Sequence, residues 1–439
     1  MGAGRTDPAG PERDRGFARA GERFLFLGAA GMGMAPLAGW LAASGYPVCG
    51  YDDDLKREVR EYLEGAGVAA RDFLLPEHVR AFDTVVRSSA VAEGHPLLEA
   101  ARASGARVLR RGELLAAIAA TRRFVAVVGS HGKTSTCGMI AHGLVRAGLP
   151  GDYILGGFFQ EGGPAPARAS GSAWLIAEVD ESDGTIEAFA PEVTLLLNVD
   201  WDHADYYRTE SAMEAVFRRL AARTRGCLVA PDDPRLPSAP EGVRRIYPAP
   251  AELPGDGLNR GNAAGALAVL RLLDGSAGPE LLEGFPGMAR RQHVRHREAG
   301  FRVVEDYAHH PTELRAVLGW LRQLAPEDRL AVVFQPHRYS RTRQFKEAFA
   351  EVLGEADALY LLPVYAAHEA PVEGGRVEDL CGAFAGERPT VLAPDFVGAR
   401  ELCRAVSGRG GVTLAFLGAG DIETFAALFL EGWRAGFDA

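Results

Sequence analysis

The chain has 439 residues, of which 47% are hydrophobic and 24% charged, and its formal net charge is −10. This length predicts several globular domains, and the acidic balance argues against DNA or RNA binding as the main function. No apolar run reaches the roughly 18 residues of a membrane helix and the five cysteines form no CxxC pair, so we expect no membrane partner, no zinc site and a cytoplasmic location.

Strand and helix patterns alternate along most of the chain. Residues 1–21 are polar and rich in Gly, Pro and Arg, which predicts a disordered tail. Beyond them, apolar runs of strand length alternate with amphipathic segments, a pattern typical of parallel α/β sheets. The runs predict strands within 23–30, 47–54, 83–91, 121–130, 174–180, 193–199, 226–231, 302–307, 329–335, 358–365, 388–394 and 412–420. We divide the chain into three successive α/β units at 22–121, 122–292 and 293–439.

A first glycine cluster, LFLGAAGMGMA, follows the first predicted strand. It places Gly28, Gly31 and Gly33 at a strand-to-helix turn, where a backbone without side chains can approach a phosphate. Asp52 follows about 20 residues later, in a suitable place to bind a ribose or a base donor. The spacing is G-x-x-G-x-G, which weakens a nicotinamide dehydrogenase as the alternative. A glycine turn without a ligand is a further alternative.

The stretch GSHGKTST resembles a shortened phosphate loop between a strand and a helix. Val127 stands where the full motif has its first glycine. Lys133 would contact the β- and γ-phosphates of a nucleotide, and the Thr134 hydroxyl would bind Mg2+. The predicted ATP-binding residues of the loop are Gly129, Ser130, His131, Gly132, Lys133, Thr134 and Ser135.

Acidic residues follow two later strands, in WLIAEVDESDGT and NVDWDHADYY. Side chains at the carboxyl ends of neighbouring parallel strands meet at one edge of the sheet, so both groups could face the phosphate loop. Glu178 is a suitable Mg2+ ligand, and His203 is a softer one that could act through water. Asp183 and Asp205 are better explained as solvated charges or helix caps.

In this order, GSHGKTST, AEVDESDGT and NVDWDH resemble the Mur ligases, which build the peptide of the bacterial cell wall. EDYAHHPTE, QPHRYSRTR and VYAAHEAP in the last third are similar to the branch that joins L-alanine to UDP-N-acetylmuramate. GAAGMGMAPLA, RSSAV and RRGELL extend the resemblance to nearly the whole chain from about residue 22.

The resemblance implies both a fold and a reaction. The expected fold is three successive α/β domains with mostly parallel sheets: a Rossmann-like UDP-binding domain, a P-loop ATPase-like central domain and a Rossmann-like C-terminal domain. The expected reaction consumes ATP to link L-alanine to the carboxylate of UDP-N-acetylmuramate through an acyl phosphate, in a monomer or a homodimer. The alternatives are a recycling ligase that attaches a tripeptide to the same acid and a nucleotide-binding relative with weakened catalysis.

The resemblance also assigns site residues. It implies catalytic roles for Lys133, His203, His309, His310 and Arg338, and metal binding by Thr134, Glu178 and His203. Asn259 and Asn262 would lie by the adenine, and Asp52, Ser88 and Ser89 by the uridine nucleotide. Two local alternatives remain: His309 or His310 could cap the following helix, and Arg338, Arg341 and Arg343 could form one solvated face.

The chain departs from the family pattern at four places. Leu258 replaces a histidine, Gln292 replaces an aromatic residue, and Gly50-Tyr51-Asp52 replaces Gly-Ser-Asp. The segment 235–257 is shorter than usual. These differences concern the adenine and uridine contacts and leave the phosphate and metal chemistry unchanged.

Overall fold

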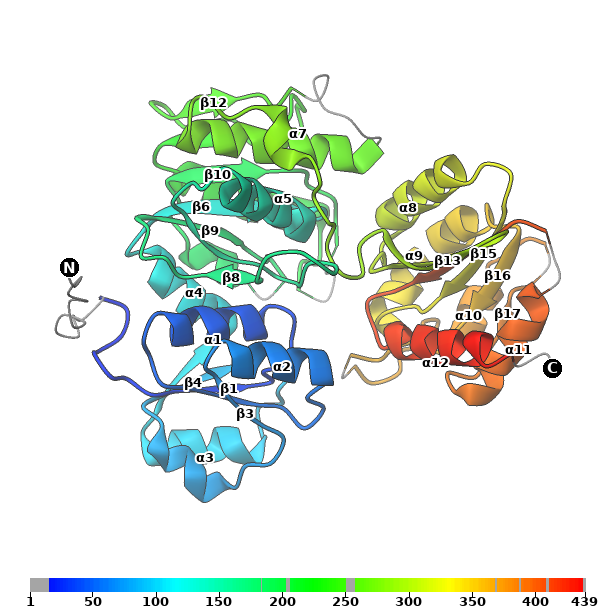
Figure 1. Cartoon of the computed structure of the whole chain (residues 1–439), viewed down its shortest axis with the longest axis horizontal. Coiled ribbons are helices and arrows are strands. Elements are labelled where there is room, and N and C mark those ends of the chain that lie inside the picture. Colours follow the sequence, from blue (N-terminus) through cyan, green and yellow to red (C-terminus); the bar gives the residue numbers. More distant parts are fainter. Residues whose placement is uncertain are drawn as a thin grey trace, which may run out of the picture.

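The computed structural model describes residues 16–182, 184–202, 206–249, 257–367, 369–386, 388–407 and 410–436. These residues form three α/β sheets in sequence order, with the third set apart from the other two (Figure 1). Most neighbouring strands are parallel, which confirms the expected fold class. The proposed domain boundaries fall between the sheets, since β5 ends at Arg110, β6 begins at Arg123 and β13 begins at His293.

The first sheet has five parallel strands in the order β3-β2-β1-β4-β5, which is the Rossmann order. Its strands are β1 (Phe24–Leu27), β2 (Val48–Tyr51), β3 (Ala69–Arg71), β4 (Thr84–Arg87) and β5 (Arg107–Arg110). Its helices are α1 (Met34–Ala43), α2 (Arg57–Gly65), the 3-10 turn η1 (Pro76–Ala81), α3 (Pro96–Ser104) and α4 (Arg111–Ala119). The order reverses at β1, so the loop with the first glycine cluster lies at the edge where such sheets bind ligands.

The central sheet has seven strands in the order β12-β11-β10-β6-β9-β7-β8, and only the β7–β8 pair is antiparallel among those described. The strands are β6 (Arg123–Val128), β7 (Asp152–Ile154), β8 (Ala167–Arg168), β9 (Trp174–Glu178), β10 (Val193–Leu196), β11 (Cys227–Val229) and β12 (Arg244–Ile246). Its helices are α5 (Lys133–Arg146), η2 (Thr185–Ala188), α6 (Glu210–Arg223), α7 (Gly257–Leu273) and η4 (Pro279–Leu282). The loops after β6, β9 and β10 meet at one edge, because these parallel strands are neighbours.

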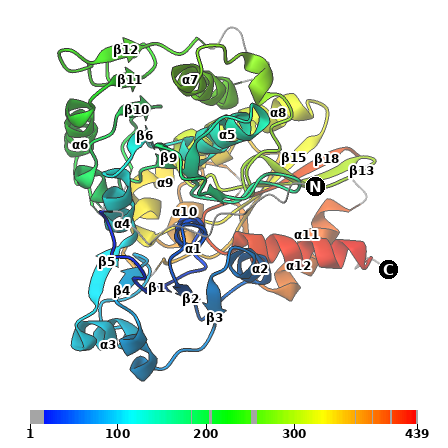
Figure 2. The same ribbon diagram turned by 60° about the vertical axis from the view of Figure 1, so that its left-hand side comes forward.

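The third sheet has the order β13-β14-β18-β15-β16-β17, with an antiparallel β13–β14 hairpin. Its strands are β13 (His293–Glu298), β14 (Phe301–Asp306), β15 (Arg329–Phe334), β16 (Ala358–Leu361), β17 (Thr390–Val391) and β18 (Val412–Leu417). The helices are α8 (Pro311–Leu324), α9 (Tyr339–Leu353), α10 (Val377–Cys381), α11 (Phe396–Val406) and α12 (Ile422–Arg434). In Figure 2, α8 lies beside α7 of the central unit.

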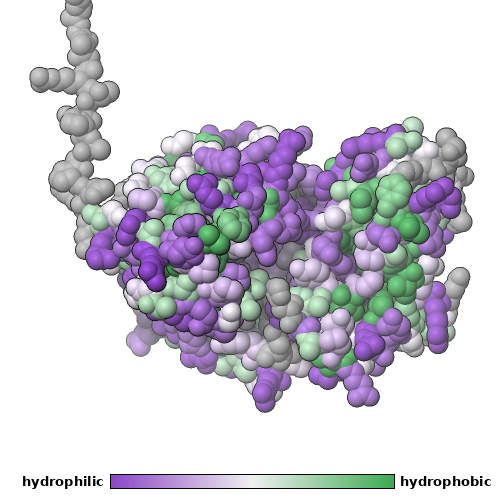
Figure 3. All heavy atoms as spheres, turned by 90° about the horizontal axis from the view of Figure 1, so that it is seen from below, coloured by the Kyte–Doolittle hydropathy of each residue, from purple (hydrophilic) through white to green (hydrophobic). Residues whose placement is uncertain are grey.

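The hydrophobic cores divide the molecule differently from the three sheets. One core cluster runs from Phe24 and Trp40 in the first unit to Phe124 and Phe217 in the central unit. The third unit has separate clusters on the two faces of its own sheet. Figure 3 shows a notch between the third unit and the rest, with hydrophilic residues along it. The first two units therefore share buried apolar surface, whereas the third meets them largely through polar groups.

Part of the expected N-terminal tail is packed. Phe17 and Ala18 are both only 5% exposed, and the Phe17 ring contacts those of Trp40 and Tyr46. The prediction of a disordered tail over 1–21 is therefore wrong for these residues, because the aromatic side chain of Phe17 packs into the core of the first unit.

Among the described residues, no helix combines the length and apolar character needed to cross a lipid bilayer.

Candidate active site

The phosphate loop joins β6 to α5, as the sequence predicted. Gly129 and Gly132 have φ angles of +138° and +84°, which other residues rarely adopt. A Cβ on Gly132 would also approach Asn262 Oδ1 to 2.5 Å. The backbone conformation at both positions therefore favours glycine over any other residue. The loop leaves Lys133 as the first residue of α5.

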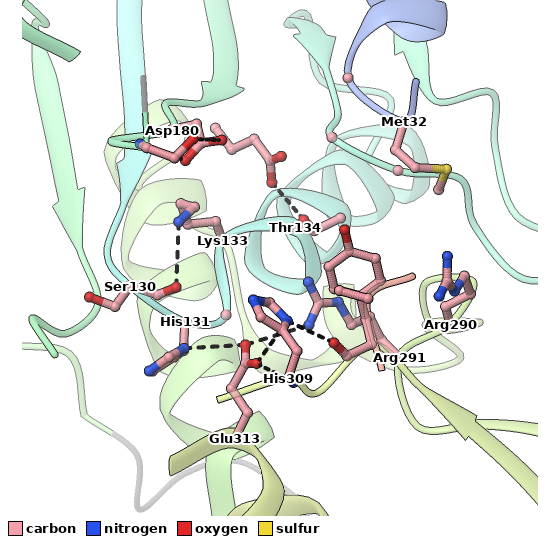
Figure 4. Close-up of a pocket in the computed structure, with 18 of the residues that line it drawn as sticks. Met32, Ser130, His131, Lys133, Thr134, Asp180, Arg290, Arg291, His309 and Glu313 are labelled. Atoms are coloured by element: carbon pink, nitrogen blue, oxygen red, sulfur yellow. Dashed lines mark hydrogen bonds and ion pairs between the residues drawn. The ribbon is translucent and has the colours of Figure 1, made fainter. Parts of the chain in front are cut away.

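Lys133 is held at the loop by Glu181, which follows the neighbouring strand β9. Its Nζ donates to Gly129 O at 2.7 Å and lies 3.0 Å from Glu181 Oε2. It also donates to Ser130 O at 3.4 Å, as Figure 4 shows. Burial lowers the pKa of Lys133, but the carboxylates of Glu181 and Asp180 outweigh burial and raise the pKa above its usual value. The lysine is therefore a fixed positive charge beside the loop.

Thr134 and Glu178 form the oxygen pair at the predicted metal site. Thr134 Oγ1 donates to Glu178 Oε2 at 2.8 Å. Glu178 packs so closely on Gly156 that a Cβ there would overlap its carboxylate. A hydroxyl and a carboxylate beside a phosphate loop suit Mg2+. His203 lies outside the described residues, as do Asp183 and Asp205, and no group of three or more His, Cys, Asp or Glu ligands occurs in the described part of the chain.

The C-terminal unit closes the other side of the site. Arg341 of α9 donates through Nε and Nη2 to Asp202 Oδ1 at 3.0 and 2.8 Å, and both residues are nearly inaccessible. Arg341 also contacts His337 Nδ1 at 3.0 Å. This ion pair fixes α9 against the loop after β10. Arg341 therefore lies in a buried ion pair with Asp202 and not on a solvated face.

Arg338 has a strained backbone at the start of α9. Its φ is +68°, and its N–H donates to Tyr365 O at 2.8 Å. The guanidinium lies 4.0 Å from Glu369 Oε1 and lines the same cavity as Lys133. A non-glycine residue held in this region is typical of a functional site.

His309 and His310 have different surroundings. His309 Nδ1 lies 2.9 Å from Tyr307 O, and burial lowers the pKa of its imidazole to about 4. A neutral His309 ring therefore lines the cavity, and the catalytic role that the resemblance implies for it stays a prediction. His310 accepts a hydrogen bond from Thr312 N at 3.3 Å, which caps α8, and packs its ring against Phe345. The capping alternative therefore describes His310, which lies behind the cavity wall.

The cavity at the centre of these groups has a volume of about 320 Å³, within the usual range for small-molecule sites. Its lining contains more cations than anions. The cations are Arg111, Lys133, Arg290, Arg291, Arg338 and Arg341, and the anions are Glu178, Asp180, Asp202 and Glu313. This balance favours a polyanionic ligand such as a nucleotide phosphate chain.

A second cavity of about 350 Å³ lies against the other side of the phosphate loop. Ser135, Asn259 and Asn262 line it together with Trp320 and Phe285, so a flat polar ring would find amides and apolar surface there. Asn259 Nδ2 donates to Gln292 Oε1. The side chain of Leu258 lies outside the described residues.

The first glycine cluster reaches the first cavity through Met32 and Gly33. Gly28 has a φ of +81°, and a Cβ on it would come within 2.7 Å of Ser88 Cβ. Asp52 Oδ2 accepts a hydrogen bond from Ala30 N at 2.8 Å. The structure thus brings Gly28, Ser88 and Asp52 together beside β1, while Gly31 lies in the turn and Ser89 is exposed.

Several lining residues were not singled out from the sequence. These are Met32, Arg111, Arg290, Arg291, Tyr307 and Glu313. Glu313 stands four residues after His309, a spacing that brings both side chains to one side of a helix start. This spacing is the feature of the sequence that could have indicated Glu313 as a site residue. Arg111 belongs to the RRGELL stretch that carries part of the family resemblance, whereas Arg290 and Arg291 lie in the connection that leads to β13.

The chain is similar to known proteins over nearly its full length. Residues 23–123 match the model of the Mur ligase family, catalytic domain, and residues 290–420 match that of the Mur ligase, glutamate ligase domain. A UDP-N-acetylmuramate–L-alanine ligase of Kineococcus radiotolerans is 39% identical, with 95% of this chain and 97% of the relative aligned. One of a Synechococcus species is 35% identical over 91% of this chain and 93% of the relative.

Solved structures show the same fold. A UDP-N-acetylmuramate–alanine ligase from Thermotoga maritima superposes with a TM-score of 0.76 at 23% identity, covering 94% of this chain and 99% of that one. A murein peptide ligase from Psychrobacter arcticus gives a TM-score of 0.69 at 20% identity, with 94% and 99% covered. These similarities leave the dehydrogenase alternative without support. The full-length sequence identity shows that the chain belongs to the Mur ligase family.

Proposed function

We propose that the protein is an ATP-dependent ligase that joins L-alanine to the carboxylate of UDP-N-acetylmuramate in peptidoglycan precursor synthesis. The observation that carries the proposal is the meeting of Lys133, Thr134 and Glu178 with residues of both other units in one cavity. Eight relatives between 32% and 39% identical all have the name UDP-N-acetylmuramate–L-alanine ligase.

The phosphate loop would activate the acid. A carboxylate oxygen of the substrate attacks the γ-phosphorus of ATP, a C–O–P bond forms, and ADP leaves. Lys133 is placed to neutralise charge on the transferring phosphoryl group, and the loop N–H groups to bind its oxygens. The amine of L-alanine then attacks the acyl carbon, phosphate leaves with the bonding pair, and the amine loses its proton.

Thr134 and Glu178, with His203, are the residues that would hold Mg2+. The bound ion would neutralise phosphate charge. The hydroxyl and carboxylate oxygens fit a hard cation, and the imidazole of His203 would be a ligand directly or through water.

The UDP-sugar would lie at the first glycine cluster. Met32 and Gly33 share the cavity of Lys133, so a ligand bound there could extend its acid group toward the ATP phosphates. Asp52, Ser88 and Ser89 are our candidates for uridine contacts. We place the enzyme in the cytoplasm, as a monomer or a homodimer.

Arg338 and His309 are candidates for orienting the incoming amino acid. Both line the cavity from the C-terminal unit. The Arg338 guanidinium suits a carboxylate, and the neutral His309 ring suits a hydrogen bond to an amine.

A ligation assay tests this proposal. Purified protein is supplied with UDP-N-acetylmuramate, ATP and Mg2+, and phosphate release is compared for L-alanine, glycine, L-serine and the cell-wall tripeptide. We expect the highest kcat/KM with L-alanine. Turnover only with tripeptide would favour the recycling ligase, whose structural similarity to this chain is nearly as high. Nucleotide binding without turnover on any of them would favour the catalytically weakened relative.

A further inference from the structure

His131 lies where the two cavities meet. Four residues line both of them: His131, Gly132, Arg291 and Glu313. A ligand with a base in one cavity and phosphates in the other must pass this point. The geometry of His131 therefore bears on how a nucleotide spans the two cavities.

The backbone of His131 is fixed on both sides. Its N–H donates to Asn198 Oδ1 at 2.9 Å, and its carbonyl accepts from Asn198 Nδ2 at 3.1 Å. These two bonds attach the middle of the phosphate loop to the end of β10. The imidazole is then the part of His131 that can respond to its surroundings.

The imidazole lies between two carboxylates that come from different units. Nε2 lies 3.2 Å from Asp200 Oδ2 in the central unit. Nδ1 lies 3.2 Å from Glu313 Oε1 on α8, a contact that Figure 4 shows. Both nitrogens lie within ion-pair distance of a carboxylate, which favours the cationic form of the ring. His131 is only 7% exposed, so little water screens these contacts.

Glu313 is itself held in place by the C-terminal side. Its Oε2 accepts from His309 N at 3.0 Å, and its Oε1 lies 3.8 Å from Arg291 Nη1. Glu313 is therefore a fixed part of the docked third unit and moves with α8.

We propose that His131 is a positioning residue through which docking of the C-terminal unit sets the phosphate loop for nucleotide binding. When α8 is docked, Glu313 and Asp200 hold the ring from both sides, and the loop has one conformation. When α8 moves away, the buried imidazolium keeps one carboxylate and its orientation is no longer fixed.

The interface makes such coupling physically reasonable. Among the residues that the structure describes, the third unit shares no core cluster with the other two. Polar contacts such as Arg341–Asp202 and His131–Glu313 therefore carry much of its docking. Coupling is reciprocal by thermodynamic necessity. Nucleotide binding must therefore favour docking to the same extent that docking favours nucleotide binding.

A double-mutant cycle on the full chain tests the proposal. His131→Asn, Glu313→Gln and the double variant are titrated with a non-hydrolysable ATP analogue and Mg2+. We expect each single substitution to weaken binding about tenfold, and the double variant to be little weaker than either, since both remove one contact. Losses that multiply in the double variant would overturn the proposal, because the two residues would then act independently.

Matched control substitutions test whether a loss of analogue affinity is specific to the positions of His131 and Glu313. His142→Asn changes a histidine on α5, the helix after the phosphate loop, whose Nε2 contacts Glu283 O. Glu351→Gln changes an exposed acid on α9 that is paired with Arg315 on α8. Both should leave analogue affinity within about twofold. A tenfold loss in either control would show that the effect is not specific to the His131–Glu313 contact.

Docking can be measured without the reaction. Small-angle scattering should show the wild type becoming more compact when the analogue is added, and Glu313→Gln should lose most of this change. If His131→Asn does not fold, Glu313→Asp is compared with Glu313→Gln instead. The shorter acid keeps the charge, so it should recover part of the analogue affinity lost in Glu313→Gln. If Glu313→Asp recovers no affinity, the proposal is wrong.

The proposed coupling rests on the proposed ATP site, but it is measured by nucleotide binding and not by ligation. A protein that shows the coupling without ligating L-alanine would therefore refute only the proposed function.

Discussion

The chain contains two glycine loops that follow the same local plan and differ in charge. Each joins a central parallel strand to a helix and contains glycines with positive φ, Gly28 in the first and Gly129 and Gly132 in the second. In the first loop, the N–H of Ala30 is bonded to the carboxylate of Asp52. The second loop is followed at once by Lys133.

This difference shows that a glycine turn does not determine which ligand it accepts. An acid bonded to a loop amide favours hydroxyl or N–H donors and disfavours a naked phosphate nearby. A lysine at the helix start, added to the helix dipole, favours phosphate. Positive charge near the first loop comes instead from Arg111 of α4, which packs over Gly33. The comparison leads to the predictions below, from the largest effect to the smallest.

Lys133→Ala should have the largest effect. We expect kcat to fall by about 10²–10³-fold or more, because one preorganised charge at the phosphoryl group is lost. Glu181, which is fully buried, would also lose its partner at a cost of about 3–5 kcal/mol. Adding Glu181→Gln should restore the melting temperature without activity. Near-normal turnover in the single variant would show that the second loop does not bind phosphate.

Glu178→Gln should mainly alter the metal dependence. The amide has no charge to offer a divalent cation, so we expect the Mg2+ concentration for half-maximal activity to rise about 10- to 100-fold. The control is Glu192→Gln, whose partner Arg123 lies at the other end of β6. An unchanged Mg2+ requirement would move the metal away from Thr134 and Glu178.

Alanine at one glycine of each loop should separate the two substrates. Gly132→Ala would crowd Asn262, and Gly28→Ala would crowd Ser88. We expect the first to raise the KM for ATP and the second the KM for UDP-N-acetylmuramate, each about tenfold. Gly148→Ala, with a φ of +64° and no neighbour within 4 Å, measures the backbone strain alone. If both loop variants raised the same KM, the two loops would not serve different ligands.

The last prediction concerns the pH dependence of stability and not activity, and we expect only the second loop to contribute to it. The carboxylates of Asp200 and Glu313 outweigh burial and raise the pKa of His131 to about 9, with Arg291, His309 and His310 also nearby. Because the folded pKa exceeds the ordinary value of about 6.5, the stabilisation is complete below pH 6.5 and disappears as the pH rises through 9. It amounts to about 3 kcal/mol.

Melting curves of the wild type and His131→Asn test this sign. The difference between their melting temperatures should narrow from pH 6.5 to pH 9.5. A difference that stays constant would mean that the His131 ring does not titrate in this range.

Much of the fold followed from local pattern. The strands β6 and β18 contain the apolar runs 124–128 and 414–417, and the helix from Lys133 follows Gly129 and Gly132. Several short elements were not predicted: β8 has two residues, β12 lies in a turn-rich stretch, and α10 has five residues. Such elements are too short to show a period, and they form because a neighbouring strand or helix offers hydrogen bonds.

The candidate site was predictable where its residues follow strands of one sheet. The sequence could place Lys133, Thr134 and Glu178 together, since β6 and β9 are neighbours. It could not show that Glu313 would meet His131, or that Arg341 would pair with Asp202. Nor could it show that His309 is neutral, because the pKa depends on the burial that packing produces.

The amino-acid sequence by itself determined the three α/β units, the phosphate loop and the acids around it. These features depend on glycine positions, on Lys133 and on apolar periodicity, all of which can be read within a few neighbouring residues. Tertiary structure alone decided how the third unit meets the other two and which histidine is charged. It also decided that the first glycine loop shares a cavity with Lys133. Those outcomes depend on distances between residues far apart in the chain, and only the packed fold sets such distances.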